Sequence, residues 1–169
     1  MQMVKKILFV LLVSWFALLL FMPKEELYFE PERALAKQGV EINEGSIDQG
    51  LFDLVLKDVT IYVEGVKVAT VKRISLFTLL FYSKLKIEEM HTDKGLKSIL
   101  SVYMEKTVLS HSVLAPLKIY MKARGDIGEL KGYISLREHR VYMTFIHDKK
   151  AAIVKKFLKK DAKGWYYEF

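Results

Sequence analysis

Two hydrophobic patterns divide the chain. Residues Ile7–Met22 form a continuous apolar run in which Ser14 is the only polar residue. From Val40 onward, apolar and polar residues alternate with a period of two, which places the apolar side chains on one face of a β-strand. The pattern therefore predicts an N-terminal helix followed by a mainly β, antiparallel domain with flanking helices.

The apolar run predicts a membrane anchor. As a helix it covers about 24 Å at about 1.5 Å per residue, against a hydrocarbon core of roughly 30 Å. Lys5, Lys6 and Lys24 lengthen its reach because their amines extend to the two interfaces. The expected anchoring side chains are Ile7, Leu8, Phe9, Val10, Leu11, Leu12, Val13, Trp15, Phe16, Leu18, Leu19, Leu20 and Phe21.

A cleaved signal peptide and a buried core helix are the alternatives to an anchor. A signal peptide ends in small residues at its cleavage site. This run ends in Leu18–Met22 followed by Pro23, with no small residue at which to cleave. The ending therefore favours an uncleaved anchor.

Flanking charges predict the orientation of the anchor. Lys5 and Lys6 precede the run, and Lys24-Glu25-Glu26 follows it, so the basic N-terminal side is expected to stay cytoplasmic. These features predict a single-pass protein of a bacterial inner membrane. Its expected parts are an anchor at 1–22, a juxtamembrane helical segment at 23–39 and a periplasmic β-rich domain at 40–169.

The juxtamembrane segment carries helix-boundary signals. Glu30-Pro31-Glu32-Arg33 places proline and acidic residues in a first helical turn, and Gly39 is a typical stop. The helix is expected to pack on the domain, and lying on the bilayer is the alternative.

Alternation predicts strands in the first half of the domain. Phe52, Leu54 and Leu56 share one face, while Val59, Ile61 and Val63 continue it in the opposite phase, so a β-bulge is expected at Lys57-Asp58. A Glu64-Gly65 turn sets Val63 opposite Val66 and Ile61 opposite Val68. Further strands are expected at 40–42, 66–76 and 85–90, with a turn-rich segment at 45–50; segments 77–82 and 96–111 stay open between helix and strand.

The second half gives the clearest β pattern. Segments 117–124, 130–137 and 141–145 alternate strictly and are joined by short turns, which predicts an antiparallel meander. Residues 149–160 are expected to form a basic amphipathic helix, and residues 165–169 a final strand or an aromatic tail at the membrane interface.

Charge adds a candidate membrane-surface contact. The formal net charge is +7, which favours an anionic membrane surface or an acidic protein over nucleic acid for a domain outside the cytoplasm. The basic helix offers Lys155, Lys156, Lys159 and Lys160 to such a surface. A simply solvated helix face is the alternative.

No constellation of residues predicts chemistry. The chain has no cysteine, and its histidines (His91, His111, His139 and His147) lack the spacing that places two metal ligands on one helix face. No nucleophile elbow and no phosphate-binding glycine loop is present in the sequence. We therefore expect neither an enzyme, nor a cofactor, nor a metal site.

The region Pro23–Glu89 resembles a known family. A helix is followed by Gly39-Val40 and a short strand, then by the strand-turn LKDVTIYVEG at Leu56–Gly65 and by VATVKRIS at Val68–Ser75. This arrangement resembles GspN-type inner-membrane proteins of type II secretion and is similar to the broader AsmA-like group. The resemblance implies a non-catalytic, curved periplasmic β-sheet whose partners are the membrane and envelope secretion or transport proteins.

Lipid binding is the alternative function. In AsmA-like relatives, and in the LptC-like proteins that share this architecture, an apolar groove is thought to carry lipid or lipopolysaccharide. The inward positions expected to line such a groove are Leu54, Ile61, Ile119 and Ile134. If the protein instead binds partners by strand addition, Val66–Ser75 is the expected edge.

The orientation is testable with a reporter fusion. An alkaline phosphatase fused after Phe169 is expected to be active, because the flanking charges place the C-terminus outside the cytoplasm. The N-terminus of the mature protein is expected to remain uncleaved. An inactive but well-expressed fusion would contradict the orientation, and a mature N-terminus near Pro23 would indicate a signal peptide.

Overall fold

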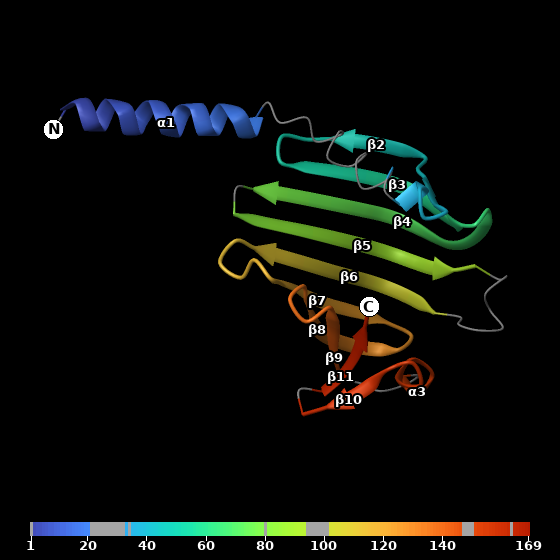
Figure 1. Ribbon diagram of the computed structural model, residues 1–169. Helices are drawn as coiled ribbons and strands as arrows, with labels where there is room; N and C mark the ends of the chain where they lie inside the picture. Colours follow the sequence, from blue (N-terminus) through green and yellow to red (C-terminus); the bar gives the residue numbers. More distant parts are fainter. Residues whose placement is uncertain are drawn as a thin grey trace.

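A single open antiparallel sheet forms the body of the protein (Figure 1). The computed structural model describes residues 2–20, 33, 35–79, 81–93, 102–146, 151–162 and 164–169. Helix α1 (Gln2–Leu20) precedes the sheet, and helix α3 (Ala151–Lys155) lies between its last strands. The strands are β1 (Val40–Asn43), β2 (Ser46–Gln49), β3 (Asp53–Val63), β4 (Val66–Leu79), β5 (Tyr82–Thr92), β6 (Tyr103–Ser112), β7 (Lys118–Gly125), β8 (Gly128–Ser135), β9 (Arg140–Phe145), β10 (Lys159–Asp161) and β11 (Gly164–Glu168). The predicted mainly β, antiparallel fold is thus confirmed.

Sheet order follows the chain almost throughout. The order is β1-β3-β4-β5-β6-β7-β8-β9-β11-β10, and β2 also pairs with β3, so β1 and β2 lie end to end along one edge. Figure 1 shows β3 to β6 side by side, whereas β9 and β11 run steeply across that direction. Gly132 in β8 permits the close approach of β9, because a Cβ at this position would lie 2.0 Å from the carbonyl oxygen of Tyr142. The strand direction therefore changes between β6 and β11 (Figure 1).

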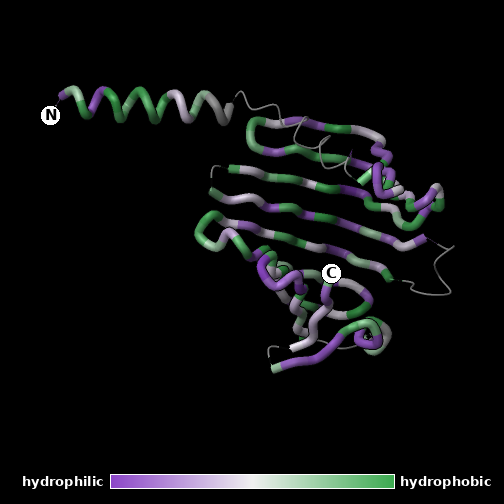
Figure 2. The backbone as a smooth tube through the Cα atoms, viewed as in Figure 1, coloured by the Kyte–Doolittle hydropathy of each residue, from purple (hydrophilic) through white to green (hydrophobic). Residues whose placement is uncertain are grey.

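Helix α1 confirms the predicted N-terminal helix. It begins before Ile7, and its last described residue is Leu20; Phe21 and Met22 lie outside the described residues. Figure 2 shows that α1 is hydrophobic along most of its length. Across the described ranges, no helix combines the length and the apolar character needed to cross a membrane.

The juxtamembrane helix is described only at its end. Arg33, Leu35 and Ala36 are helical, and Gly39 follows with a φ of 77°. The positive φ explains why glycine occupies this position after the helix. The remainder of the predicted helix lies outside the described residues.

Strands of the first half extend further than predicted. In the ambiguous segment 77–82, residues 77–79 end β4 and Tyr82 begins β5, and residues 103–111 of the segment 96–111 belong to β6. The turn-rich segment 45–50 contains a strand, β2, which alternation did not predict because Ile47 is its only apolar residue. It forms because the edge of β3 offers unpaired backbone groups.

The predicted β-bulge at Lys57-Asp58 is wrong. Lys57 pairs with Arg73 and Val59 with Val71, so the register of β3 against β4 is unchanged across Asp58. Asp58 instead has a φ of 52°. This conformation changes which face the following side chains point to, without an inserted residue.

The register shift lies further along β3, between Ile61 and Tyr62. Val63 pairs with Val66 as predicted, but Ile61 pairs with Ala69 rather than with Val68.

The predicted meander is confirmed as β7, β8 and β9, and the final strand as β11. The predicted helix at 149–160 is wrong beyond its first part. Helix α3 ends at Lys155, and Lys159–Asp161 forms β10 against β11. Residues 147–150 lie outside the described residues. Pairing with the outer edge of β11 satisfies backbone groups that a helix would leave unpaired there, so it overrides the helical pattern.

The core occupies one face of the sheet. Leu54, Leu56, Val59 and Val71 are almost completely buried, at 1–3% exposure. Half-buried apolar side chains of five strands pack against them: Ile42, Ile47, Ile61, Ile74, Leu76, Ile87 and Met90. Ala123, Leu130 and Ala151 are buried in the C-terminal half.

Replacing a core residue tests this face. Leu56→Ala is expected to lower the free energy of unfolding by about 2–5 kcal/mol, because it leaves a cavity in the packed cluster. The neighbouring Lys57→Ala, on the other face, is expected to change it by no more than about 0.5 kcal/mol. Urea unfolding of the full chain in detergent measures both values, and equal losses would contradict the assignment of faces.

Candidate functional site

The apolar face of the sheet continues across many strands. One row runs in direct register through Leu54, Leu76, Leu85, Leu109, Met121, Gly132, Met143 and Trp165, from β3 to β11. The strand register places all four predicted groove residues on this apolar face: Leu54, Ile61, Ile119 and Ile134. Leu54 is buried at 2% exposure, whereas the other three are half-buried. The structure therefore places the four on one face, with Leu54 closed off in the core.

A belt of charged residues crosses the opposite face. Each of four neighbouring strands contributes two consecutive charged residues, and together they line one hollow: Lys57, Asp58, Lys72, Arg73, Glu88, Glu89, Glu105 and Lys106. The belt is defined by these eight residues. Four are basic and four acidic, so the belt has no net formal charge.

At the belt, the alternation of side chains between the two faces of the sheet changes phase in each of the four strands. On β3, Leu56 and Val59 both belong to the buried cluster, so the two residues between them face the other way. The same change occurs on β4 between Ile74 and Val71, with unchanged register to β3. On β5 and β6 it falls between Ile87 and Met90 and between Thr107 and Met104. On the edge, β1 and β2 are interrupted at Glu44-Gly45.

The change of phase stops at β7. Between β6 and β7 the register shifts between Met104 and Lys106, so Glu105 has no partner on β7 and forms a bulge. The alternation of β7 therefore continues unbroken.

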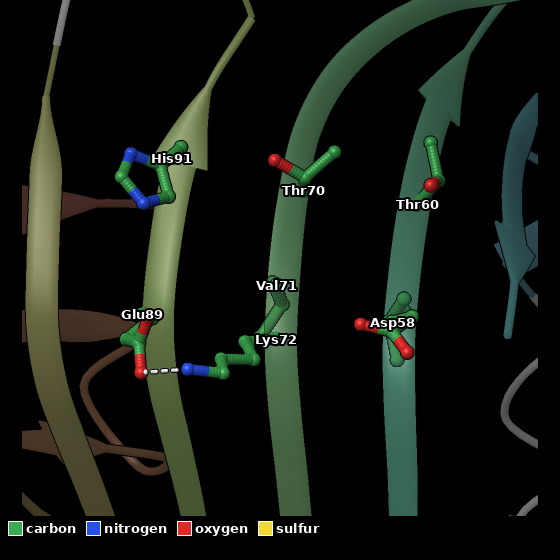
Figure 3. A pocket seen from close by; sticks show the side chains of 8 residues that line it. Asp58, Thr60, Thr70, Val71, Lys72, Glu89 and His91 are labelled. Atoms are coloured by element: carbon green, nitrogen blue, oxygen red, sulfur yellow. Dashed lines mark hydrogen bonds and ion pairs between the residues drawn. The ribbon is translucent and has the colours of Figure 1, made fainter. Parts of the chain in front are cut away.

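Ion pairs hold the centre of the belt. The Lys72 ammonium donates to Glu89 at 2.7 Å (Figure 3), and this hydrogen bond and charge raise the pKa of Lys72. Lys86 donates to Glu88 and lowers the pKa of that carboxyl. Figure 3 also shows Asp58, Thr60, Thr70 and His91 around the hollow beside the pair. Lys72 is exposed, whereas Lys86, Glu88 and Glu89 are half-buried and each is in an ion pair. The belt therefore presents paired charges rather than a desolvated acid or base.

Two belt residues have a positive φ. Asp58 has a φ of 52° and Glu89 a φ of 50°. Such left-handed conformations are uncommon in residues other than glycine, asparagine and aspartate. Glu89 is therefore the strained position, and its side chain is the one that binds Lys72.

A tyrosine ladder crosses the same face in the C-terminal half. Tyr120, Tyr133, Tyr142 and Tyr166 lie in direct register on β7, β8, β9 and β11. The ring centroids of Tyr133 and Tyr142 are 5.0 Å apart, and those of Tyr142 and Tyr166 are 5.9 Å apart. Tyr142 is 3% exposed and donates its hydroxyl to Glu138 at 2.8 Å. Cross-strand aromatic pairs of this kind stabilise a sheet by packing.

Arg140 lies beside Tyr166, at the end of the ladder. Its guanidinium carbon lies 4.7 Å from the ring centroid of Tyr166, and its Nη2 donates to Glu168 at 3.3 Å. Tyr142 and Glu168 raise the pKa of Arg140 above its ordinary range. The guanidinium is thus held between an aromatic ring and a carboxylate.

The four predicted membrane-surface lysines do not share a helix. Lys155 ends α3 and lies over the rings of Phe145 and Trp165, at 5.3 and 5.6 Å. Lys156 is exposed in the following turn. Lys159 and Lys160 belong to β10, where Lys159 contacts Glu168 at 3.6 Å and Lys160 lies 5.6 Å from the Trp165 ring. The predicted single basic helix surface is therefore wrong.

The described histidines are dispersed. His91 packs on Tyr103 at 4.5 Å between ring centroids, His111 contacts the carbonyl oxygen of Pro116, and His139 lies near Phe169. His147 lies outside the described residues. Where side chains are described, no group of three histidine, aspartate or glutamate residues is placed to hold a metal ion.

Two signals in the sequence mark the polar face. The doublets Lys57-Asp58, Lys72-Arg73, Glu88-Glu89 and Glu105-Lys106 each interrupt an alternating strand. Tyr120 and Tyr133 likewise alternate with apolar residues in their strands. Alternation alone places each residue on a face, but alignment between strands requires the register.

Comparisons with known proteins give no match. No protein-family model, no curated protein and no solved structure is significantly similar to this chain.

The strain at Glu89 is testable by a matched pair of glycine substitutions. Glu89→Gly and Glu88→Gly each remove one ion pair on the sheet surface. Glu88→Gly is expected to lower the free energy of unfolding by about 1 kcal/mol more than Glu89→Gly, because only position 89 has a φ that glycine adopts more readily. Urea unfolding measures both, and equal losses would contradict strain at Glu89.

Proposed function

We propose that the protein is a membrane-anchored, non-catalytic component of a secretion or transport assembly in the bacterial cell envelope. The observation that carries the proposal is an apolar helix, exposed on all sides, attached to a broad open sheet. In this proposal the N-terminus is cytoplasmic, the run Ile7–Met22 anchors the chain in the inner membrane, and the sheet lies in the periplasm.

Exposure of α1 supports the anchor. Its apolar side chains from Ile7 to Phe16 are 48–68% exposed, and they surround the helix rather than forming one stripe. A helix that is apolar on all sides is stable when lipid or protein covers it. The bilayer is the cover that fits the flanking lysines Lys5 and Lys6.

Sheet geometry supports a role by contact. Across the described residues the pairing runs from β1 and β2 at one edge to β10 at the other, so both faces extend over many strands. The belt and the tyrosine ladder place charges and aromatic edges on one of them. The belt groups with shifted pKa, Lys72 and Glu88, are already held in ion pairs on the sheet surface, which suits recognition of another protein better than proton transfer.

Strand addition at Val66–Ser75 is not part of this proposal. That segment lies inside β4, which pairs with β3 on one side and β5 on the other. The outermost strands are the short β1 and β2, and the three-residue β10 with its two lysines. Short and charged outer strands discourage pairing with another chain. Partner proteins are therefore expected on the polar face.

Lipid binding on the apolar face is the second candidate. The continuous apolar row from β3 to β11 favours it, because acyl chains need an extended apolar surface. Burial of Leu54 and Leu56 in the core limits that surface in the first half of the sheet. Ile61 packs against the buried cluster, so the half-buried Ile119 and Ile134 are the predicted groove positions left for lipid.

Adjacent residues on β7 distinguish the two candidates. Ile119 has the register of the apolar face, and Tyr120 lies on the polar face at 48% exposure. A photo-crosslinking amino acid at Tyr120 in living cells is expected to capture proteins of the envelope assembly, identified by mass spectrometry. The same group at Ile119 is the matched control. Lipid adducts from Ile119, with no protein captured from Tyr120, would contradict the assembly role and favour lipid transfer.

A further inference from the structure

One end of the sheet exposes apolar side chains at every described loop. Leu51 in the β2–β3 loop is 65% exposed, and Phe81 in the β4–β5 turn is 59% exposed. The β6–β7 loop exposes Val113, Leu114 and Leu117 at 53%, 96% and 51%, and Leu136 in the β8–β9 loop is 41% exposed. We name these six residues the loop rim. Figure 2 shows hydrophobic colour at the β2–β3 and β6–β7 loops on this side.

Backbone hydrogen bonds join the loops into a continuous surface. The amide of Thr78, near the end of β4, donates to the carbonyl of Phe52 at 2.9 Å. Val113 donates to Phe81 at 3.0 Å, and Leu136 donates to Leu117 at 3.0 Å. The rim is therefore fixed by the sheet rather than formed by independent loops.

Described turns at the opposite end are different. The tip of the β3–β4 turn is Glu64-Gly65, flanked by Val63 and Val66 at 38% and 58% exposure, and the β7–β8 turn has Asp126 beside Ile127, which is buried at 8% exposure. The tips of the described turns at this end are therefore polar or buried, whereas those of the loop rim are apolar. Apolar residues at turn tips gain nothing from exposure to water, since exposed turns normally carry polar residues. The asymmetry between the two ends therefore points to a cover at the loop rim.

The direction of α1 identifies that cover. Figure 1 shows α1 projecting beyond the loop-rim ends of β3 to β6 and running in roughly the direction of these strands. A bilayer that receives α1 along its axis therefore faces this end of the sheet. Three exposed basic residues (Lys84, Lys118 and Arg137) and two exposed acidic residues (Asp53 and Glu138) lie in or beside the rim loops. Their formal charge is +1, which is compatible with anionic headgroups.

We propose that the loop rim inserts into the headgroup and upper acyl region of the bilayer that holds α1, so that the sheet stands on the membrane with its strands directed away from it. The proposal rests on the membrane anchoring proposed above. Leu114 and Phe81 are the leading contacts, because apolar side chains at the membrane boundary gain free energy from leaving water. The two faces of the sheet then remain free at a fixed height above the lipid.

The absence of cysteine from the chain permits a direct test. Single-cysteine variants of the full chain, Leu114→Cys and Phe81→Cys in the rim and Glu64→Cys at the opposite end, are labelled with the fluorophore NBD. Each is reconstituted into vesicles of phosphatidylcholine and phosphatidylglycerol, with or without lipids spin-labelled on the upper acyl chain. The two rim labels are expected to show blue-shifted emission that the spin-labelled lipid quenches, and the label at residue 64 neither effect. Position 114 is nearly fully exposed, so its substitution leaves the packing intact.

Flotation of the vesicles separates this proposal from the anchoring on which it rests. A chain that does not float with the vesicles contradicts the anchor itself. A chain that floats but whose rim labels are not quenched contradicts only the insertion of the rim. Blue-shifted rim labels that spin-labelled lipid does not quench would show that protein, such as a second copy of this chain, covers the rim, and quenching at residue 64 equal to that at residue 114 would also overturn the proposal.

Discussion

Register between antiparallel strands is the constraint on which this structure depends. A strand that changes its phase turns its apolar side chains to the other face, so its neighbours must change phase in the same row or lose the shared core. Here β3, β4, β5 and β6 change phase together, and the edge formed by β1 and β2 is interrupted beside them. The buried cluster of Leu54, Leu56, Val59 and Val71 survives because of this alignment.

The charged belt is the consequence on the other face. Two consecutive residues per strand must point away from the core wherever the phase changes, and water is the environment that both meet. Charged residues occupy all eight positions on β3 to β6, and opposite charges such as Lys72 and Glu89 pair across strands. The belt thus follows from the core, although it also provides a distinctive surface for a partner protein.

The two ends of the sheet, like its two faces, differ in polarity. The loop rim is apolar and lies toward α1, and the described turns at the other end carry Glu64 and Asp126. In the proposed arrangement, lipid holds the helix and the rim, while the polar face is presented to envelope proteins. One open sheet then serves as a platform whose orientation at the membrane is set by its loops.

The sequence by itself determined the elements whose pattern is local. Alternation located β3, β4 and the meander from β7 to β9, Glu64-Gly65 located a turn, and the apolar run located α1. Only the tertiary structure decided β2 and β10, because these edge strands form by pairing with neighbours rather than from their own apolar pattern. It also decided that Asp58 turns the phase without a bulge, that Tyr120 to Tyr166 align, and that Leu51, Phe81 and Leu114 share one end. Periodicity assigns a residue to a face within its own strand, whereas alignment between strands depends on pairings between distant segments of the chain.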